Sequence, residues 1–196
     1  MTYKTLLAGV ALALLPSTTL SAAEPERSTV AVGVEKPAER LPTDIRRVTL
    51  IVRSIENSLK LYRDVLGMRS NYDTMVETSG VALPAGPPGA KVRLVLLNSN
   101  DPYIGWIGLM EWIDPAFPDP GPYPKRMGPG GHVIVTNTDD VDGRCAAAAK
   151  VPGVTMTAPA RMQEYPGRNG GAPIRVRGCN FFDPDGTLIE LNQLLK

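Results

Sequence analysis

The sequence contains few of the residues on which many catalytic and metal-binding sites depend, with 2 cysteines and 1 histidine among 196 residues. It has no Cys-x-x-Cys pair, and neither Cys145 nor Cys179 has a histidine close by in sequence, so a cysteine nucleophile is not supported. Charge of one sign is not in excess either, because the formal net charge is +1 and no basic run exceeds two residues. Nucleic acid and anionic membrane surfaces are therefore poor candidates as partners.

The sequence also lacks an apolar run long enough to span the roughly 30 Å hydrocarbon core of a bilayer. The run at residues 6–15 is ten residues long, follows Lys4, and is followed by the small residues Ser21, Ala22 and Ala23. This order is typical of a secretory signal peptide, so we expect residues 1–23 to be removed. The mature protein should then be periplasmic or secreted, with no membrane segment left.

Residues 24–43 mix charges, prolines and small residues without a sustained period, which predicts a flexible tether. Residues 44–196 are the right length for a single domain of about 150 residues with its own core. In an oxidising compartment Cys145 and Cys179 could pair, but the sequence does not show that their Cα atoms come within reach. It leaves the disulfide open.

Two segments of this domain share one pattern. Residues 47–67 and 132–153 each begin with alternating apolar residues, continue through a cap-type polar residue into a helical stretch, and end at a glycine. Three strand-like segments follow each helix, at 68–77, 91–98 and 106–113 and again at 154–161, 174–182 and 187–192. A proline-rich connector at 114–131 separates the halves. The repeat predicts an α+β fold of two βαβββ modules, residues 45–113 and 131–194.

Three strings carry a resemblance to a known family: RRVTLIVRSIENSLKLYRDVLGM, GGHVIVTNTDDVD and NFFDPDGTLIELNQ. They resemble the opening of the first module, the opening of the second module and the closing hairpin of vicinal oxygen chelate (glyoxalase-like) proteins. The resemblance implies that the two modules face one shared cleft. That family includes glyoxalase I, extradiol dioxygenases, methylmalonyl-CoA epimerase, fosfomycin-modifying enzymes and bleomycin-sequestering proteins, so the fold alone does not define a function.

The resemblance also implies a divalent metal in the cleft, with ligand positions that fall on Arg47, Glu111, His132 and Glu190. Strand alternation predicts that these side chains point away from the helix-packed face, so that the His and the two Glu converge on one cavity. Such a set suits Zn²⁺, Ni²⁺, Fe²⁺ or Mn²⁺. Arg47 departs from the family, because a guanidinium cannot ligate a metal and could itself neutralise the two carboxylates. Metal binding is therefore left open.

Further residues could contact a substrate. Arg175, Arg177 and Tyr165 are candidates for substrate binding in the cleft, with ordinary surface positions as the alternative. The Gly- and Pro-rich segment 157–173, which contains Arg168, is interpreted as a lid or a loose loop.

Three functions fit these residues. The first is a lyase or isomerase that resembles glyoxalase I and acts on a small oxygenated substrate: Glu190 would shuttle a proton, and a metal or Arg47 would stabilise the enediolate-like charge. The second is a non-catalytic protein that sequesters a small molecule. The third, an extradiol dioxygenase, is disfavoured because Arg47 takes a histidine position. An exported protein would also not meet a glutathione hemithioacetal, since that thiol pool is mainly cytosolic. A monomer and a homodimer both remain open.

Overall fold

The computed structural model describes residues 43–123 and 125–195. The predicted signal peptide and all but the last residue of the predicted tether lie outside the described residues. Within the described part of the chain, no helix is long and apolar enough to cross a membrane.

The first module is a four-stranded mixed sheet, here called sheet 1, with one helix. Its elements are β1 (Arg47–Ile51), α1 (Ile55–Leu59), the π-helical turn η1 (Lys60–Val65) that continues α1, β2 (Arg69–Glu77), β3 (Lys91–Asn98) and β4 (Trp106–Asp114). The strand order is β1-β4-β3-β2, with β1 parallel to β4 and the other pairs antiparallel.

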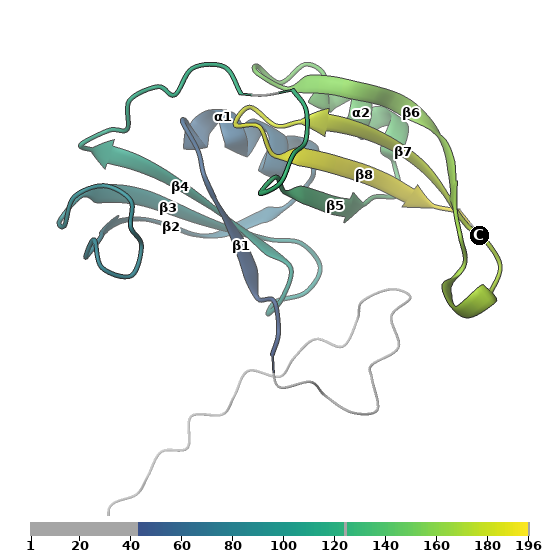
Figure 1. Cartoon of the computed structure of the whole chain (residues 1–196), viewed down its shortest axis with the longest axis horizontal. Coiled ribbons are helices and arrows are strands. Elements are labelled where there is room, and N and C mark those ends of the chain that lie inside the picture. Colours follow the sequence, from purple (N-terminus) through teal and green to yellow (C-terminus); the bar gives the residue numbers. More distant parts are fainter. Residues whose placement is uncertain (1–42, 124, 196) are drawn as a thin grey trace, which may run out of the picture.

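The second module repeats this plan in sheet 2. Its elements are β5 (Val133–Asn137), α2 (Val141–Ala148), β6 (Thr155–Tyr165), the 3₁₀ turn η2 (Arg168–Gly170), β7 (Ile174–Phe182) and β8 (Leu188–Leu194). The order β5-β8-β7-β6 and the parallel β5–β8 pair match sheet 1. The predicted α+β fold of two βαβββ modules is confirmed (Figure 1).

Each helix begins at a residue whose side chain satisfies a free backbone N–H group. Ser54 Oγ accepts from Asn57 N at 3.3 Å at the start of α1, and Asp140 Oδ1 accepts from Gly143 N at 2.9 Å at the start of α2. Such caps replace hydrogen bonds that the first helical turn cannot make within itself. They mark equivalent points of the two modules.

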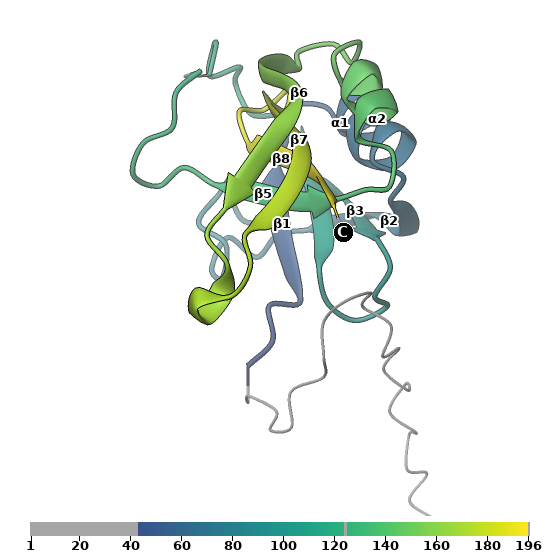
Figure 2. The ribbon, with the colours of Figure 1, turned by 90° about the vertical axis from the view of Figure 1, so that its right-hand side faces the viewer.

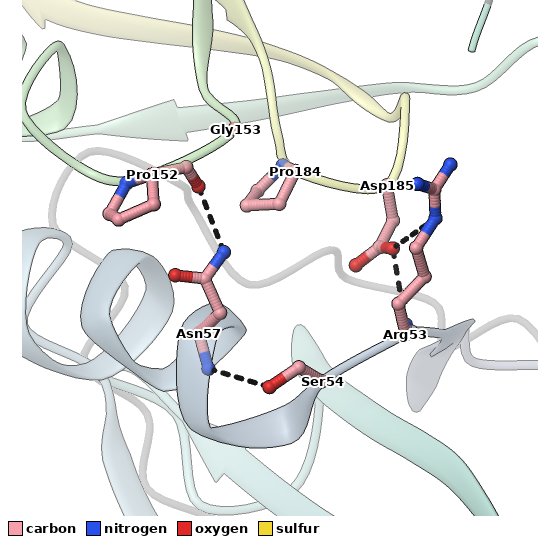
Figure 3. A pocket seen from close by; sticks show the side chains of 7 residues that line it. All are labelled: Arg53, Ser54, Asn57, Pro152, Gly153, Pro184 and Asp185. Carbon is pink, nitrogen blue, oxygen red and sulfur yellow. Dashed lines mark hydrogen bonds and ion pairs between the residues drawn. The ribbon is translucent and has the colours of Figure 1, made fainter. Parts of the chain in front are cut away.

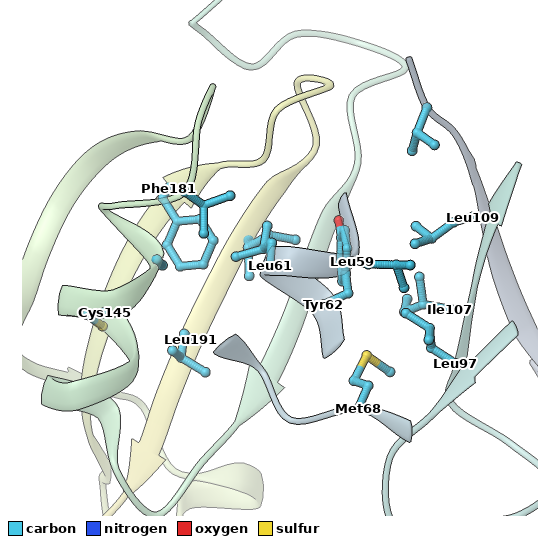
Figure 4. Close-up of a cluster of buried hydrophobic side chains, with 14 of the residues drawn as sticks. Leu59, Leu61, Tyr62, Met68, Leu97, Ile107, Leu109, Cys145, Phe181 and Leu191 are labelled. Carbon is cyan, nitrogen blue, oxygen red and sulfur yellow. The ribbon is translucent and has the colours of Figure 1, made fainter. Parts of the chain in front are cut away.

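One hydrophobic core is shared by both modules. Tyr62 and Leu61 of the first module and Phe181 and Leu191 of the second are among its members, each at most 1% exposed (Figure 4). Figure 2 shows α1 and α2 next to each other on one side of the molecule. The helix-covered faces of both sheets are thus buried in the common core. The opposite face of each sheet is called its open face from here on.

A disulfide joins Cys145 of α2 to Cys179 of β7, with a Cα–Cα distance of 6.4 Å. Both residues belong to the shared core, at 5% and 0% exposure. The disulfide that the sequence left open is therefore present, and it fastens α2 to the sheet that it covers.

Candidate functional site

The open face of sheet 2 carries a polar cluster centred on Glu190. The neighbouring Ile189 and Leu191 are buried in the core, so alternation directs Glu190 to the other face. The Tyr165 hydroxyl donates to Glu190 Oε1 at 3.0 Å, and Asn192 Nδ2 donates to the same oxygen, also at 3.0 Å. Because both bonds end on Oε1, Oε2 is the oxygen through which this carboxylate can meet a ligand.

Two more side chains of β6 extend the cluster. Arg161 donates to Gln163 Oε1 and to Asn180 Oδ1, each at 3.3 Å. Gln163 Nε2 is buried and has no hydrogen-bond partner in the described part of the chain. The bond to Glu190 raises the pKa of Tyr165 above its ordinary value. The hydroxyl is therefore protonated near neutral pH and acts as a donor. The name Glu190 cluster is used below for Arg161, Gln163, Tyr165, Glu190 and Asn192.

His132 does not belong to this cluster. Strand β5 begins after it, at Val133, and Val135 is the register partner of Glu190. Val133 and Val135 are 49% and 59% exposed, whereas Ile134 packs against the core. Val133 and Val135 therefore lie on the open face with Glu190, and the prediction that His132, one position before Val133, points to that face is wrong.

Glu111 lies on the helix-covered side of sheet 1. Its Oε2 accepts from Ile55 N at 2.8 Å, which is the first backbone N–H of α1. The alternate residues Ile107 and Leu109 face the same side and are buried in the core. The predicted orientation of Glu111, away from the helices and into a cavity with His132 and Glu190, is wrong. The carboxylate supports the start of α1 instead.

The repeat itself shows which residue of sheet 1 matches Glu190. Val135 and Thr49 each lie five positions before the N-cap residue of their helix. Val135 pairs with Glu190, and Thr49 pairs with Gly108. Gly108 is therefore the counterpart of Glu190. A Cβ at Gly108 would lie 2.8 Å from Thr49 Oγ1 and 3.2 Å from Arg47 Cδ, so these two side chains fill the space above it.

The residues present do not form the expected chelating set. In residues 43–123 and 125–195 there is no group of three or more His, Cys, Asp or Glu side chains that could hold a metal. Arg47 does not neutralise the two carboxylates either, which was the alternative to a metal that the sequence left open. Within the same residues its guanidinium makes no ion pair with Glu111 or Glu190; Glu111 Oε2 accepts from Ile55 N, and Glu190 Oε1 accepts from Tyr165 and Asn192.

Of the predicted substrate-binding residues, Tyr165 lies in the Glu190 cluster and the two arginines do not. Arg177 forms a two-bonded ion pair with Asp142 of α2, at 2.8 and 2.7 Å, on the helix-covered side. Arg175 follows the same alternation and lies 3.9 Å from Glu164. The predicted lid is also shorter than 157–173, because β6 continues through Tyr165.

A hollow lies where the modules meet, between the start of α1 and the turns that precede β6 and β8. It is a cavity of about 250 Å³ lined by Arg53, Ser54, Asn57, Pro152, Gly153, Pro184 and Asp185 (Figure 3). Asn57 Nδ2 donates to Pro152 O at 2.8 Å and Arg53 N donates to Asp185 Oδ1 at 3.1 Å, so its walls are cross-links between the modules. We interpret this hollow as part of the joint, by which we mean the region where the two modules are cross-linked.

The joint contains a buried carboxyl group that sequence reasoning missed. Tyr62 OH donates to Asp183 Oδ2 at 2.7 Å, and Asp183 Oδ1 accepts from Thr187 N at 2.7 Å. Asp183 is 2% exposed, and this burial raises its pKa despite the hydrogen bonds, which act in the other direction. The Asp-Pro-Asp-Gly turn was the available signal, since its first carboxyl can bind backbone groups of the turn.

Comparison with known proteins places the chain in a family. Residues 44–191 match the family model described as the Glyoxalase/Bleomycin resistance protein/Dioxygenase superfamily, and the chain belongs to that superfamily. No functionally curated protein matches the sequence.

Among solved structures of low sequence identity, one shares the fold and two are weaker matches. A glyoxalase family protein of Bacillus cereus is 18% identical, with a TM-score of 0.60 over 82% of this chain and 100% of its own. An antibiotic-binding protein of Streptomyces is 20% identical, with a TM-score of 0.47 over 80% and 100%. The trypanothione-dependent glyoxalase I of Leishmania major is 20% identical, with a TM-score of 0.47 over 77% and 86%. At 18% identity the likeness to the Bacillus cereus protein concerns the fold alone.

Proposed function

We propose that this protein binds a small oxygenated molecule on the open face of sheet 2 and that Glu190 exchanges a proton with it, as in a lyase or an isomerase. The proposal rests on the unequal hydrogen bonding of the two oxygens of the Glu190 carboxylate. Two donors, Tyr165 OH and Asn192 Nδ2, fix Oε1 at 3.0 Å each and leave Oε2 to the ligand. A base must be held in position to take a proton from a bound carbon acid.

The rest of the cluster suits a ligand that gains negative charge when it loses a proton. Arg161 lies beside Gln163 and brings a positive charge to the edge of the cluster. Removal of a proton next to a carbonyl group places charge on the carbonyl oxygen, which N–H donors stabilise. The substrate class is therefore a small hydroxycarbonyl compound. The mechanism needs no step at a metal, in keeping with the donor set described above.

The second candidate is binding without chemistry. It is favoured by the position of Gly108, because the counterpart of Glu190 in sheet 1 has no side chain and Arg47 lies over it. An enzyme of this family that had lost half of its functional positions could still retain a ligand on the other sheet. The Glu190 cluster would then serve recognition alone.

Proton exchange separates the two candidates. Dihydroxyacetone in D₂O, followed by proton NMR, should gain deuterium at its carbon-bound positions faster with the protein than with buffer. Glu190→Gln should abolish the incorporation of deuterium. Tyr165→Phe should reduce its rate about 10-fold or more, because Tyr165 holds the carboxylate base in position. Glu164→Gln is the matched control, because Glu164 is a carboxylate on β6 of the same sheet whose side chain is 62% exposed and paired with Arg175. Binding of dihydroxyacetone without exchange would favour the second candidate, and neither binding nor exchange would refute the proposal.

We also propose that the protein is exported. The disulfide between Cys145 and Cys179 supports this, because such bonds persist mainly in oxidising compartments. Intact-mass spectrometry after expression in a Gram-negative host should find a mature terminus at or near Glu24 in the periplasmic fraction. A soluble cytoplasmic protein that retains Met1 would contradict this assignment.

A further inference from the structure

A second, smaller hydrophobic cluster lies on the open face of sheet 1, away from the Glu190 cluster. Trp112 on β4 is next to Glu111, which faces α1, so the indole points to the opposite side of the sheet. Trp112 stacks on Phe117 with ring centroids 4.5 Å apart and planes at 14°. Ala90 and Val92 complete the buried part of this cluster, which is separate from the main core.

The indole N–H of Trp112 is buried and has no acceptor. Trp112 is 4% exposed, and its Nε1 atom makes no hydrogen bond within the described residues. A buried donor without an acceptor is costly, and a native structure normally gives it a partner. The other tryptophan follows this rule, since Trp106 Nε1 donates to Asp101 O at 3.2 Å.

Segment 78–90 covers the Trp112 indole. Gly86 lies so close that a Cβ there would be 2.4 Å from Trp112 Nε1 and 3.0 Å from Cδ1. The backbone hydrogen bonds of the segment all end within it, for example Gly89 N to Thr78 O at 2.8 Å and Ala90 N to Pro87 O at 3.1 Å. In the described part of the chain the segment is held on Trp112 by apolar contact rather than by hydrogen bonds to the sheet.

We propose that Trp112 and Phe117 form a subsite for a flat, conjugated molecule that carries a hydrogen-bond acceptor, and that segment 78–90 is the lid over it. The stacked rings provide a planar apolar surface, and the unpaired indole N–H provides one donor at its edge. The surrounding side chains Val76, Ala85, Val92 and Met110 are uncharged. The ligand is therefore neutral at the part that enters. This subsite is independent of the proton exchange proposed for Glu190.

The two tryptophans make a direct test available. The indole region of a ¹H–¹⁵N spectrum should contain one signal each for Trp106 and Trp112, assigned with Trp106→Phe. Coumarin, which is flat and has a carbonyl acceptor, should shift the Trp112 signal and leave that of Trp106 in place. δ-Valerolactone, which has the acceptor without the flat ring, should shift neither, and Phe117→Ala should remove the response to coumarin.

Two glycines of the lid give a matched pair of variants. Gly86 and Gly89 both have positive φ values, +70° and +81°, so alanine strains the backbone at either position. The added methyl group would collide with Trp112 at Gly86, whereas at Gly89 nothing lies within 4 Å. Gly86→Ala should therefore open the lid and tighten coumarin binding by about 5-fold or more, because a larger fraction of the protein is binding-competent. Gly89→Ala should bind like the wild type.

The outcomes divide clearly. A selective Trp112 shift with tighter binding in Gly86→Ala supports both the subsite and its lid. Equal affinity in Gly86→Ala and Gly89→Ala would overturn the lid. The absence of a selective shift in the wild type and in Gly89→Ala, at millimolar coumarin, would overturn the subsite even if Gly86→Ala fails to fold.

Discussion

The disulfide offers the clearest quantitative test of the structure. Cys145 and Cys179 are separated by 34 residues, so the bond closes a loop of that length in the unfolded chain. In the chain-entropy description, a loop of this size stabilises the folded state by about 4 kcal/mol. For a domain of about 150 residues, that change corresponds to a fall in Tm of about 8–15 °C when the bond is lost.

Because Cys145 and Cys179 are only 5% and 0% exposed, a reductant can reach the disulfide only when the protein unfolds. Equilibrium unfolding in urea should be measured with and without a phosphine reductant, beside the double variant Cys145→Ala/Cys179→Ala. The reduced wild type and the double variant should lose similar free energies of unfolding, and the reductant should not change the double variant. A reduced wild type that stays within about 1 kcal/mol of the oxidised protein would refute the loop-closure reasoning.

Four further outcomes are expected. Tyr62→Phe removes the hydroxyl that donates to the buried Asp183 carboxyl at 2.7 Å, and should lower the free energy of unfolding in urea by about 1–3 kcal/mol. An unchanged free energy of unfolding would contradict a stabilising hydrogen bond at this position. Burial raises the pKa of Asp183 in the folded protein above its value in the unfolded chain. The stability that this carboxyl group contributes is therefore present below its unfolded-state pKa and is lost as the pH rises through its folded-state pKa. Urea titrations at several pH values should show that the free energy of unfolding falls above about pH 4 in the wild type and falls less steeply in Asp183→Asn. Glu111→Ala should lower the free energy of unfolding by about 1 kcal/mol, because it removes the acceptor at the start of α1. Addition of zinc, nickel or manganese should leave the Tm of the wild type and of Arg47→His unchanged. A clear metal-dependent rise in Tm would contradict the structural role assigned to Glu111.

The elements were predictable because apolar alternation and turn residues mark them strongly. The expected strands 91–98 and 174–182 coincide with β3 (Lys91–Asn98) and β7 (Ile174–Phe182), and the expected 106–113 falls one residue short of β4. Glu190 could also be oriented from sequence, since it lies between two apolar residues that are both buried in the core.

The orientation of Glu111 could not be read in this way. Strand β4 is apolar on both faces: Leu109 faces the shared core, while Met110 and Trp112 face the smaller cluster under the lid. Alternation shows that neighbours point in opposite directions, but it cannot show which direction is which when both sides are apolar. Strand β5 has the same ambiguity, because its Val133, Ile134 and Val135 are all apolar and the outer two are exposed. His132 was misassigned for that reason.

The internal repeat therefore preserves the architecture while the two open faces have diverged. At the position of Glu190 the first module has Gly108, and at the position of Asn192, two residues further along its strand, it has Met110. A carboxylate introduced at Gly108 would not fit there as Glu190 does in sheet 2, because the new Cβ would lie 2.8 Å from Thr49 Oγ1 and 3.2 Å from Arg47 Cδ. Both of those side chains would have to change first. Arg47 and Thr49 thus occupy the space that a carboxylate at Gly108 would need, and the proton chemistry proposed here for the open faces lies on sheet 2, at Glu190.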